Sequence, residues 1–432
     1  MASSISAKDH AHVWHPYTQH LDNPFPIVIS RGSGALLYDE DGRSYIDAIS
    51  SWWVNIHGHA HPYIAEKIYQ QALRLEHVIF TGFTHEPAAI LAERLIGLLP
   101  GQFSRIFYSD NGSTAVEVAL KMAIQYWRNL DRSQDPGKRK KIIALRDAYH
   151  GDTFGAMSLS ERGIFTLAFQ DYLFEVDFID APDANSLEEI KSYLEGIAEE
   201  ISCFIYEPLL QGAGGMKIYD ATALNELLKF FKSKNIICIA DEVLTGFGRT
   251  GKFFASEYLT FKPDIVCLSK GLTGGTMALG VTAATEEIFA AFLSRDRSKT
   301  FFHGHSFTAN PLACTAALAS MDLLEKPSCR QKISWISKTN QEFVDLLKAT
   351  HAPNIKFPRA IGTVMAFELS IGEDGYLNSV GPHISDRALK NGIYLRPLGN
   401  TVYLMPPYCI EEEQLARLHQ FLLSLNEEAI YS

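Results

Sequence analysis

Two short apolar runs, residues 236–240 and 265–268, constrain the fold of this chain more than any other feature of its sequence. Each run is largely β-branched, and each is followed by an ionisable group: Asp241 after the first and Lys270 after the second. Runs of this length and composition are typical of buried parallel strands. Because the interval between them accommodates one crossover connection, we expect the two strands to be neighbours in an open α/β sheet.

The two ionisable groups point to a specific chemistry. Ligands of open α/β sheets bind outside the carboxyl ends of the strands, so Asp241 and Lys270 can meet on one ligand. Pyridoxal phosphate chemistry requires an amine that condenses with the aldehyde and a carboxylate that keeps the pyridine nitrogen protonated. The alternative is a surface lysine and a strand-end cap. The mostly small or polar neighbours Ser269 and 271–275 favour the cofactor site, because a lysine that reaches inward through a tight turn needs them.

A turn earlier in the chain predicts a phosphate site. An expected strand, residues 104–108, leads through a short polar turn into an amphipathic helix that begins near Gly112, Ser113 and Thr114. The free backbone N–H groups and the positive dipole end of such a helix attract an anion. A plain N-cap explains the same residues without a ligand. The lysine and the aspartate downstream favour a cofactor phosphate.

Two more expected strands end in side chains that face the same crevice. The strand 142–145 runs into Tyr149, whose ring can stack on the flat face of a cofactor, although a buried structural tyrosine fits nearly as well. The strand 201–206 ends in Glu207. We therefore expect several strand ends to line one site.

The block around the lysine and the aspartate resembles a known family. It reads DEVLTGFGRTGKFFASE, followed by SKGLTGGTMALG, and is similar to the signature of class III (ω-amino acid) aminotransferases of PLP fold type I. Residues 246–251 also match the G-x-G-x-x-G of dinucleotide binders, but they open no clear amphipathic helix, which disfavours that interpretation. The resemblance implies an α/β PLP-dependent transferase of fold type I. Its large domain has a mostly parallel central sheet flanked by helices, and its smaller α+β domain comes from the N- and C-terminal segments.

Length and local patterns suggest how the chain divides. With 432 residues it is too long for one ordinary core. We expect residues 1–60 to contribute to the small domain, 61–310 to form the large cofactor-binding domain, and 311–432 to form the C-terminal small domain. The pair Asp41-Gly42 between two alternating runs predicts a β-hairpin in the first segment.

Composition excludes several classes of protein. The net charge of −11 argues against a nucleic-acid partner, which would normally require a basic surface. The six cysteines have no paired spacing and predict reduced, mostly buried thiols. The N-terminus lacks an apolar signal core, and no run approaches the roughly 18 apolar residues of a membrane helix, so we expect a cytoplasmic protein without membrane contact.

Two groups of histidines raise the question of a metal site. His57, His59 and His61 alternate with glycine and alanine, a pattern that suits a turn, and no further ligand cluster follows them. His303 and His305 are too few to hold a metal ion. We therefore predict no metal.

Further blocks narrow the resemblance to one branch of class III. HVWHPYTQ, SSWWVNIHGHAHP, DAYHGDTFGAMSLS, QGAGGM, and IYLRPLGN followed by VYLMPPY look most like the biotin-pathway branch. That branch transfers an amino group to 8-amino-7-oxononanoate, usually from S-adenosylmethionine. The resemblance implies pyridoxal 5′-phosphate as cofactor, small-molecule substrates, and a homodimer with active sites at its interface.

The same resemblance implies site residues. It assigns catalysis to Lys270, Asp241 and Tyr149, phosphate binding to Gly112, Ser113 and Ser306 of the partner subunit, and substrate binding to Tyr17, Trp52, Trp53, Asp152, Arg249, Gly304 and Arg396. Arg396 suits a substrate carboxylate because its guanidinium offers a planar, two-pronged donor. The tyrosine and the two tryptophans would wall an apolar slot. Core packing is the usual role of such tryptophans, but their position between turns favours the pocket.

One departure from the branch affects the amino donor. The loop reads His303-Gly304-His305-Ser306, whereas many S-adenosylmethionine-dependent members have Gly-Pro-Thr after the first His-Gly pair. Lysine, which some relatives use, is therefore an alternative donor. Two further hypotheses are another class III enzyme of the ornithine, GABA or glutamate-semialdehyde type, and a non-catalytic binding protein that keeps the fold; the intact Lys270 disfavours the latter.

Overall fold

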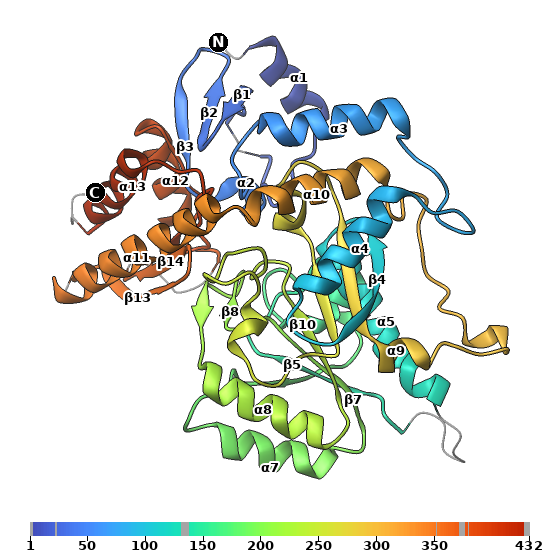
Figure 1. The fold of residues 1–432 in the computed structure, drawn as a ribbon. Coiled ribbons are helices and arrows are strands. Elements are labelled where there is room, and N and C mark those ends of the chain that lie inside the picture. Colours follow the sequence, from blue (N-terminus) through green and yellow to red (C-terminus); the bar gives the residue numbers. More distant parts are fainter. Residues whose placement is uncertain are drawn as a thin grey trace.

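A seven-stranded sheet forms the centre of the molecule (Figure 1). The computed structural model describes residues 3–21, 24–130, 138–350, 352–370, 376–378 and 380–426. The strands follow the order β4-β12-β11-β10-β7-β5-β6. Their bounds are β4 (Phe103–Ser109), β5 (Lys141–Leu145), β6 (Asp177–Ile179), β7 (Ile201–Tyr206), β10 (Ile237–Asp241), β11 (Ile265–Leu268) and β12 (Gly280–Thr285). β12 pairs antiparallel with β11 and β4, and the other described pairs of this sheet are parallel, so the predicted, mostly parallel α/β sheet is confirmed.

The sheet is buried on both faces, which explains why its strands are continuous apolar runs. In β10, Ile237 and Ile239 join one apolar cluster, whereas Cys238 and Ala240 join the other. Successive side chains of a strand point to opposite faces, so both faces need apolar residues. α5 (Gly112–Leu130) packs against β11 and β12, and α8 (Ala221–Ser233) packs against β10.

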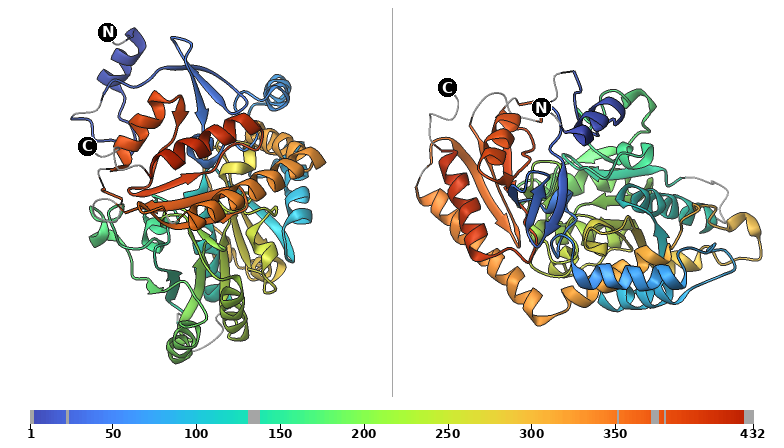
Figure 2. Two further views of the ribbon diagram at one scale, coloured as in Figure 1. Left: turned by 90° about the vertical axis from the view of Figure 1, so that its left-hand side faces the viewer. Right: turned by 90° about the horizontal axis from the view of Figure 1, so that it is seen from above.

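The remaining helices surround this sheet or pack beyond it (Figures 1 and 2). α10 lies against α3 and α4, and α7 lies against α8. The helices of five residues or more are α1 (Ser4–His12), α3 (Pro62–Arg74), α4 (Glu86–Leu98), α6 (Phe154–Leu159), α7 (Leu187–Ile197), α9 (Glu286–Ala290), α10 (Pro311–Leu324), α11 (Pro327–Ala349), α12 (Val380–Lys390) and α13 (Glu412–Ser424). Short 3₁₀ turns are η1 (Gln170–Tyr172), η2 (Ala255–Tyr258), η3 (Lys270–Thr273) and η4 (Arg297–Lys299).

One smaller sheet combines strands from the N-terminal and C-terminal parts of the chain. In the sheet β1-β2-β3-β15, the C-terminal β15 pairs in parallel with the N-terminal β3, and Figure 2 shows these segments together at one end of the molecule. The hairpin predicted at Asp41-Gly42 is confirmed, since β2 and β3 pair antiparallel around it. The strand bounds are β1 (Ile29–Ser33), β2 (Leu36–Asp39), β3 (Ser44–Asp47), β8 (Leu210–Gln211), β9 (Lys217–Ile218), β13 (Ile355–Ile361), β14 (Val364–Leu369), β15 (Ile393–Tyr394) and β16 (Thr401–Leu404).

The four residues labelled α2 (Ser50–Trp53) form a tight turn rather than a regular helix. Ser50, Ser51 and Trp53 have φ angles of 54°, 59° and 69°, in the left-handed region. Residues with a Cβ are disfavoured there, so the surrounding structure must hold the turn in place.

Other features bear on the remaining predictions. All six cysteines are unpaired. None of the described helices is long and apolar enough to cross a membrane. Within the part of the chain that the structure describes, no three His, Cys, Asp or Glu side chains are grouped so that they could hold a metal ion.

Candidate active site

The two strand ends singled out in the sequence lie side by side. Asp241 is the last residue of β10 and is in register with Cys267 of the parallel strand β11. Lys270 follows β11 and opens η3 with a φ of 46°. A non-glycine residue with such a φ is uncommon and is often found at functional sites. The fold thus brings the amine and the carboxylate to the same edge of the sheet.

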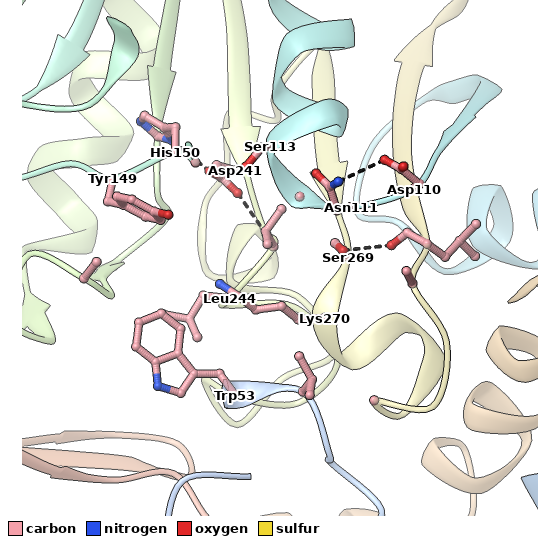
Figure 3. A pocket seen from close by; sticks show the side chains of 18 of the residues that line it. Trp53, Asp110, Asn111, Ser113, Tyr149, His150, Asp241, Leu244, Ser269 and Lys270 are labelled. Carbon is pink, nitrogen blue, oxygen red and sulfur yellow. Dashed lines mark hydrogen bonds and ion pairs between the residues drawn. The ribbon is translucent and has the colours of Figure 1, made fainter. Parts of the chain in front are cut away.

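These residues line a cavity of about 450 Å³ at the carboxyl edge of the parallel strands. In Figure 3 the side chain of Lys270 lies between Trp53 and Asp241, with Tyr149 and His150 to one side. Six of the predicted site residues line the cavity: Trp53, Gly112, Ser113, Tyr149, Asp241 and Lys270. His150 and Glu207 line it too, and neither was given a role from the sequence.

The amine of Lys270 is placed where it can lose its proton. Its Nζ lies 4.7 Å from the centre of the Trp53 ring, and it forms no hydrogen bond or ion pair with any described residue. Burial lowers its pKa, and the charge of Arg249 acts in the same direction, while Asp241 and Glu207 oppose the shift. A lysine with a lowered pKa is a better nucleophile and base near neutral pH.

Asp241 is held by two donors. Its Oδ1 accepts the Val243 N–H at 3.0 Å, and its Oδ2 lies 2.7 Å from Nδ1 of His150. Both side chains are almost completely buried. Nε2 of His150 has no hydrogen-bond partner among the described residues. When Nδ1 carries its proton, His150 donates this hydrogen bond to the carboxylate of Asp241.

Glu207 brings a second buried carboxyl to the cavity. Its oxygens accept the N–H groups of Tyr149 at 3.2 Å and Gly212 at 2.9 Å. Burial raises the pKa of Glu207 to about 7, with a further contribution from the nearby charge of Asp241. The two carboxyl groups therefore differ: Asp241 is paired with His150, whereas Glu207 keeps its proton up to about pH 7.

The N-terminus of α5 also lines the cavity, with Gly112 and Ser113. Asn111 caps the helix, because its Oδ1 accepts the Thr114 N–H at 2.9 Å. Neither Gly112 nor Ser113 has its backbone N–H bonded within the described residues. Oγ of Ser113 accepts the Asp152 N–H at 3.1 Å. Open N–H groups at a helix start suit a phosphate.

Tyr17 and Asp152 form a second polar group, which contacts the cavity-lining residue Tyr149. The hydroxyl of Tyr17 donates to Oδ2 of Asp152 at 2.5 Å and lies 3.3 Å from the Tyr149 hydroxyl. Burial and this hydrogen bond raise the pKa of Tyr17 to about 12. The guanidinium of Arg396 lies over the Trp52 ring, with 4.7 Å between Cζ and the ring centre. Tyr17 and Trp52 are each 42% exposed and their rings are 5.4 Å apart, so they form an accessible aromatic wall.

Comparison with known proteins assigns the family. The sequence model described as aminotransferase class-III matches residues 17–424. This chain belongs to the class-III aminotransferases. An adenosylmethionine-8-amino-7-oxononanoate aminotransferase from Synechococcus elongatus is 46% identical, over 97% of this chain and 99% of its own.

Solved structures agree with this assignment. A crystal structure of the adenosylmethionine-8-amino-7-oxononanoate aminotransferase from Methanocaldococcus jannaschii has a TM-score of 0.92 and 36% identity, covering 98% of each chain. An ω-transaminase from Pseudomonas jessenii, solved with PMP, has a TM-score of 0.91 and 26% identity, covering 99% of each chain. The predicted class of enzyme and the PLP-dependent fold are confirmed.

The cavity of this class-III aminotransferase fits the cofactor of its family, pyridoxal 5′-phosphate. It supplies an amine without a competing partner, a buried carboxylate for a ring nitrogen, and open N–H groups for a phosphate. Tyr149 lies at the same cavity and has its pKa raised by burial, so its hydroxyl stays neutral. The amine, the carboxylate and the N–H groups thus match the aldehyde, the ring nitrogen and the phosphate of the cofactor.

Arg249 lies away from the cavity lining and is fully buried. Its guanidinium donates to the carbonyl oxygens of Trp53 at 3.2 Å and Pro406 at 3.0 Å. It forms no ion pair with a carboxylate within the described part of the chain. In this structure Arg249 contacts backbone, and its predicted contact with substrate stays a prediction.

Gly304 and Ser306 lie outside the cavity of their own chain. Both are exposed in the segment between η4 and α10, which extends away from the central sheet in Figure 1. His303 of the same segment places Nδ1 3.0 Å from Nζ of Lys121. This position leaves the predicted contribution of Ser306 to a partner subunit open to test.

The sequence contained only weak signals for His150 and Glu207. His150 follows Tyr149 directly, so its side chain enters the site only because the turn after β5 brings it back to Asp241. Glu207 was recognised as a polar strand end, but its protonation depends on burial. Neither property can be read from neighbouring residues in the chain.

Proposed function

We propose that this aminotransferase transfers an amino group to the C7 ketone of 8-amino-7-oxononanoate to give 7,8-diaminononanoate, with S-adenosylmethionine as the donor. The observation that carries the proposal is the convergence of Lys270 and Asp241 in one cavity at neighbouring strand ends. The relatives that act on these substrates match nearly the whole length of the chain, which supports the choice of substrate.

The residues of the cavity divide the work of the reaction. Bound pyridoxal 5′-phosphate supplies an aldehyde that carries the amino group and a ring that accepts the electron pair left when a C–H proton is removed. Lys270 would hold the aldehyde until the substrate amine displaces it. Its freed amine would then carry a proton between the substrate carbon that bears the nitrogen and the aldehyde carbon of the cofactor. Asp241, supported by His150, keeps a proton on the ring nitrogen. Gly112 and Ser113 bind the phosphate through their N–H groups.

The aromatic wall suits an acceptor with a long apolar chain and a terminal carboxylate. Trp52, Trp53 and Tyr17 offer apolar faces to the chain. Arg396 can pair with the carboxylate through two parallel hydrogen bonds. The carboxylate of Asp152 accepts the Tyr17 hydroxyl and so orients it. The negative charge of this carboxylate would favour a cationic donor such as a sulfonium.

We also propose a cytoplasmic homodimer in which the active sites lie at the interface. Ser306 of the partner subunit would complete the phosphate site, and Gly304 would contact substrate from the same segment. In each subunit, residues 61–310 would form the large domain, while 1–60 and 311–432 would form the small one. The parallel pairing of β15 with β3 supports a small domain built from both ends of the chain.

The donor is tested by single half-reactions. Enzyme loaded with pyridoxal 5′-phosphate is mixed with S-adenosylmethionine, lysine, ornithine or GABA, and loss of the visible cofactor band is followed. We expect S-adenosylmethionine to react, and 7,8-diaminononanoate to be detected by mass spectrometry once the acceptor is added. If lysine reacts and S-adenosylmethionine does not, the donor is lysine, the alternative suggested by the departure at His305-Ser306. Reaction with ornithine or GABA, without conversion of the oxononanoate, would overturn the proposal.

The role of Lys270 is tested by Lys270→Ala. Borohydride treatment followed by denaturation should leave cofactor mass on the wild type and none on the variant, and transamination should fall by at least about 10³-fold. Lys262→Ala is a control on another half-buried lysine, whose ammonium bonds backbone carbonyls outside the cavity. Covalent cofactor retained on the Lys270 variant would contradict the assignment.

A further inference from the structure

The turn Ser50–Trp53 carries two walls of the site but is not stable by itself. The Trp53 ring lies beside the Lys270 amine, and its Nε1 donates to the Tyr403 hydroxyl at 2.9 Å. The Trp52 ring lies beneath Arg396. Three of the four residues of this turn have left-handed backbone conformations, although none of them is a glycine. Other groups must therefore hold the turn.

Asp47 is the first of these groups. Its side chain is completely buried, and its oxygens accept the N–H groups of Ile49 at 3.2 Å and Ser51 at 2.7 Å. Oδ2 also lies 2.8 Å from Nε2 of His59. Hydrogen bonds to a charged, buried acceptor are strong, so one carboxylate fixes the start of the turn.

Arg249 and Ser50 fix the other side of the turn. Arg249 donates to the Trp53 carbonyl and to the Pro406 carbonyl, which ties the end of the turn to the segment after β16. The Ser50 hydroxyl donates to the Met405 carbonyl at 2.8 Å. Burial lowers the pKa of Arg249, and the nearby charge of Asp47 opposes that shift, so the two buried side chains attract each other across the turn.

We infer that Asp47, oriented by His59, is a positioning residue that holds the Ser50–Trp53 turn so that Trp52 and Trp53 form the acceptor wall. This inference rests on the proposed function, because it concerns the walls of that site. Asp47 does not line the cavity, and among the described residues it forms no hydrogen bond or ion pair with Lys270 or Arg396. Its effect on substrate binding must therefore pass through the backbone of the turn.

The variant Asp47→Asn tests the inference, because its amide keeps the shape of the side chain but turns one acceptor into a donor that faces an N–H group. For 8-amino-7-oxononanoate we expect about a tenfold higher KM, with kcat per bound cofactor changed less than about threefold. Calorimetry should give about a tenfold weaker binding of the acceptor. Cofactor content and its visible spectrum should match the wild type, since the phosphate site and Asp241 are untouched.

Asp39→Asn is the matched control. Asp39 is 6% exposed in the same small sheet, and it accepts the N–H groups of Asp41 and Arg43 and the Tyr45 hydroxyl. It lies at the opposite end of the hairpin from the turn. We expect Asp39→Asn to lower thermal stability to a degree comparable with Asp47→Asn while KM stays within about twofold of the wild type.

Two variants of His59 provide a rescue. His59→Gln keeps a donor for Asp47 and should keep KM near the wild-type value, whereas His59→Leu removes the donor and should raise KM as Asp47→Asn does. A KM that is unchanged in Asp47→Asn, or raised equally in Asp39→Asn, would overturn the inference. Failure of the wild type to bind or convert the acceptor would instead count against the proposed function, so the two failures are distinguishable.

Discussion

The single residue Glu207 should make the stability of the folded protein depend on pH. Its pKa is raised from 4.5 to about 7 by burial. Between these values the folded state holds a proton that the unfolded state has released, so stability falls as the pH rises. In Glu207→Gln that loss is absent. We expect the stability of the wild type relative to Glu207→Gln to decrease by on the order of 3 kcal/mol from pH 4.5 to above pH 7.

Urea unfolding at a series of pH values measures this difference. Glu413→Gln, a substitution of an exposed glutamate on α13, is the control and should leave the pH profile of the wild type unchanged. The prediction fails if Glu207→Gln and the wild type differ by a constant amount across the interval. A constant difference would mean that Glu207 is ionised throughout, in spite of its burial.

The different burial of Trp52 and Trp53 could not be predicted from the sequence. The two tryptophans are adjacent and were predicted together, but Trp53 is buried at 4% exposure and Trp52 is 42% exposed. Lys270 and Asp241 were easier to predict, because each directly follows a strand and strand ends share one edge of a sheet. The roles of all these residues stay predictions, since geometry alone does not test them.

At the scale of elements, strands were predictable where the sequence itself carries the cause. β10 and β11 are apolar because both faces of the sheet are covered, and that pattern is visible without a structure. The Ser50–Trp53 turn was not predictable, because it lacks glycine and depends on remote partners. The Ser50 hydroxyl, for example, bonds the carbonyl of Met405, 355 residues later in the chain.

The start of α10 offers a prediction at this scale. Oδ1 of Asn310 accepts the N–H groups of Leu312 at 3.0 Å and Ala313 at 3.1 Å, which caps a helix that packs against α3 and the η3 turn. Asn310→Ala should lower the free energy of unfolding by about 1 kcal/mol, as measured by urea titration. Asn310→Asp keeps the acceptor and should lose much less. Equal losses in the two variants would show that the cap is not the cause.

Two segments of the molecule carry exposed large apolar side chains that the proposed homodimer would cover. Phe302 and Phe307 are 74% and 63% exposed on the segment before α10, and the His77 ring lies 5.4 Å from that of Phe307. Ile79 and Phe83, in the connection between α3 and α4, are also exposed. A concentration of exposed large apolar side chains commonly marks an interface. One of these two segments holds Ser306, as the proposed homodimer requires.

Subunit mixing tests whether Ser306 acts in its own chain or in the partner. Lys270→Ala inactivates one subunit, and Ser306→Asp places a carboxylate where a phosphate would bind. If Ser306 serves the partner subunit, a mixed dimer has one site with both substitutions and one site with neither. Random reassociation of the two inactive proteins should then restore about one quarter of wild-type activity. If Ser306 served its own chain, each site of the mixed dimer would carry one substitution and activity would stay near zero.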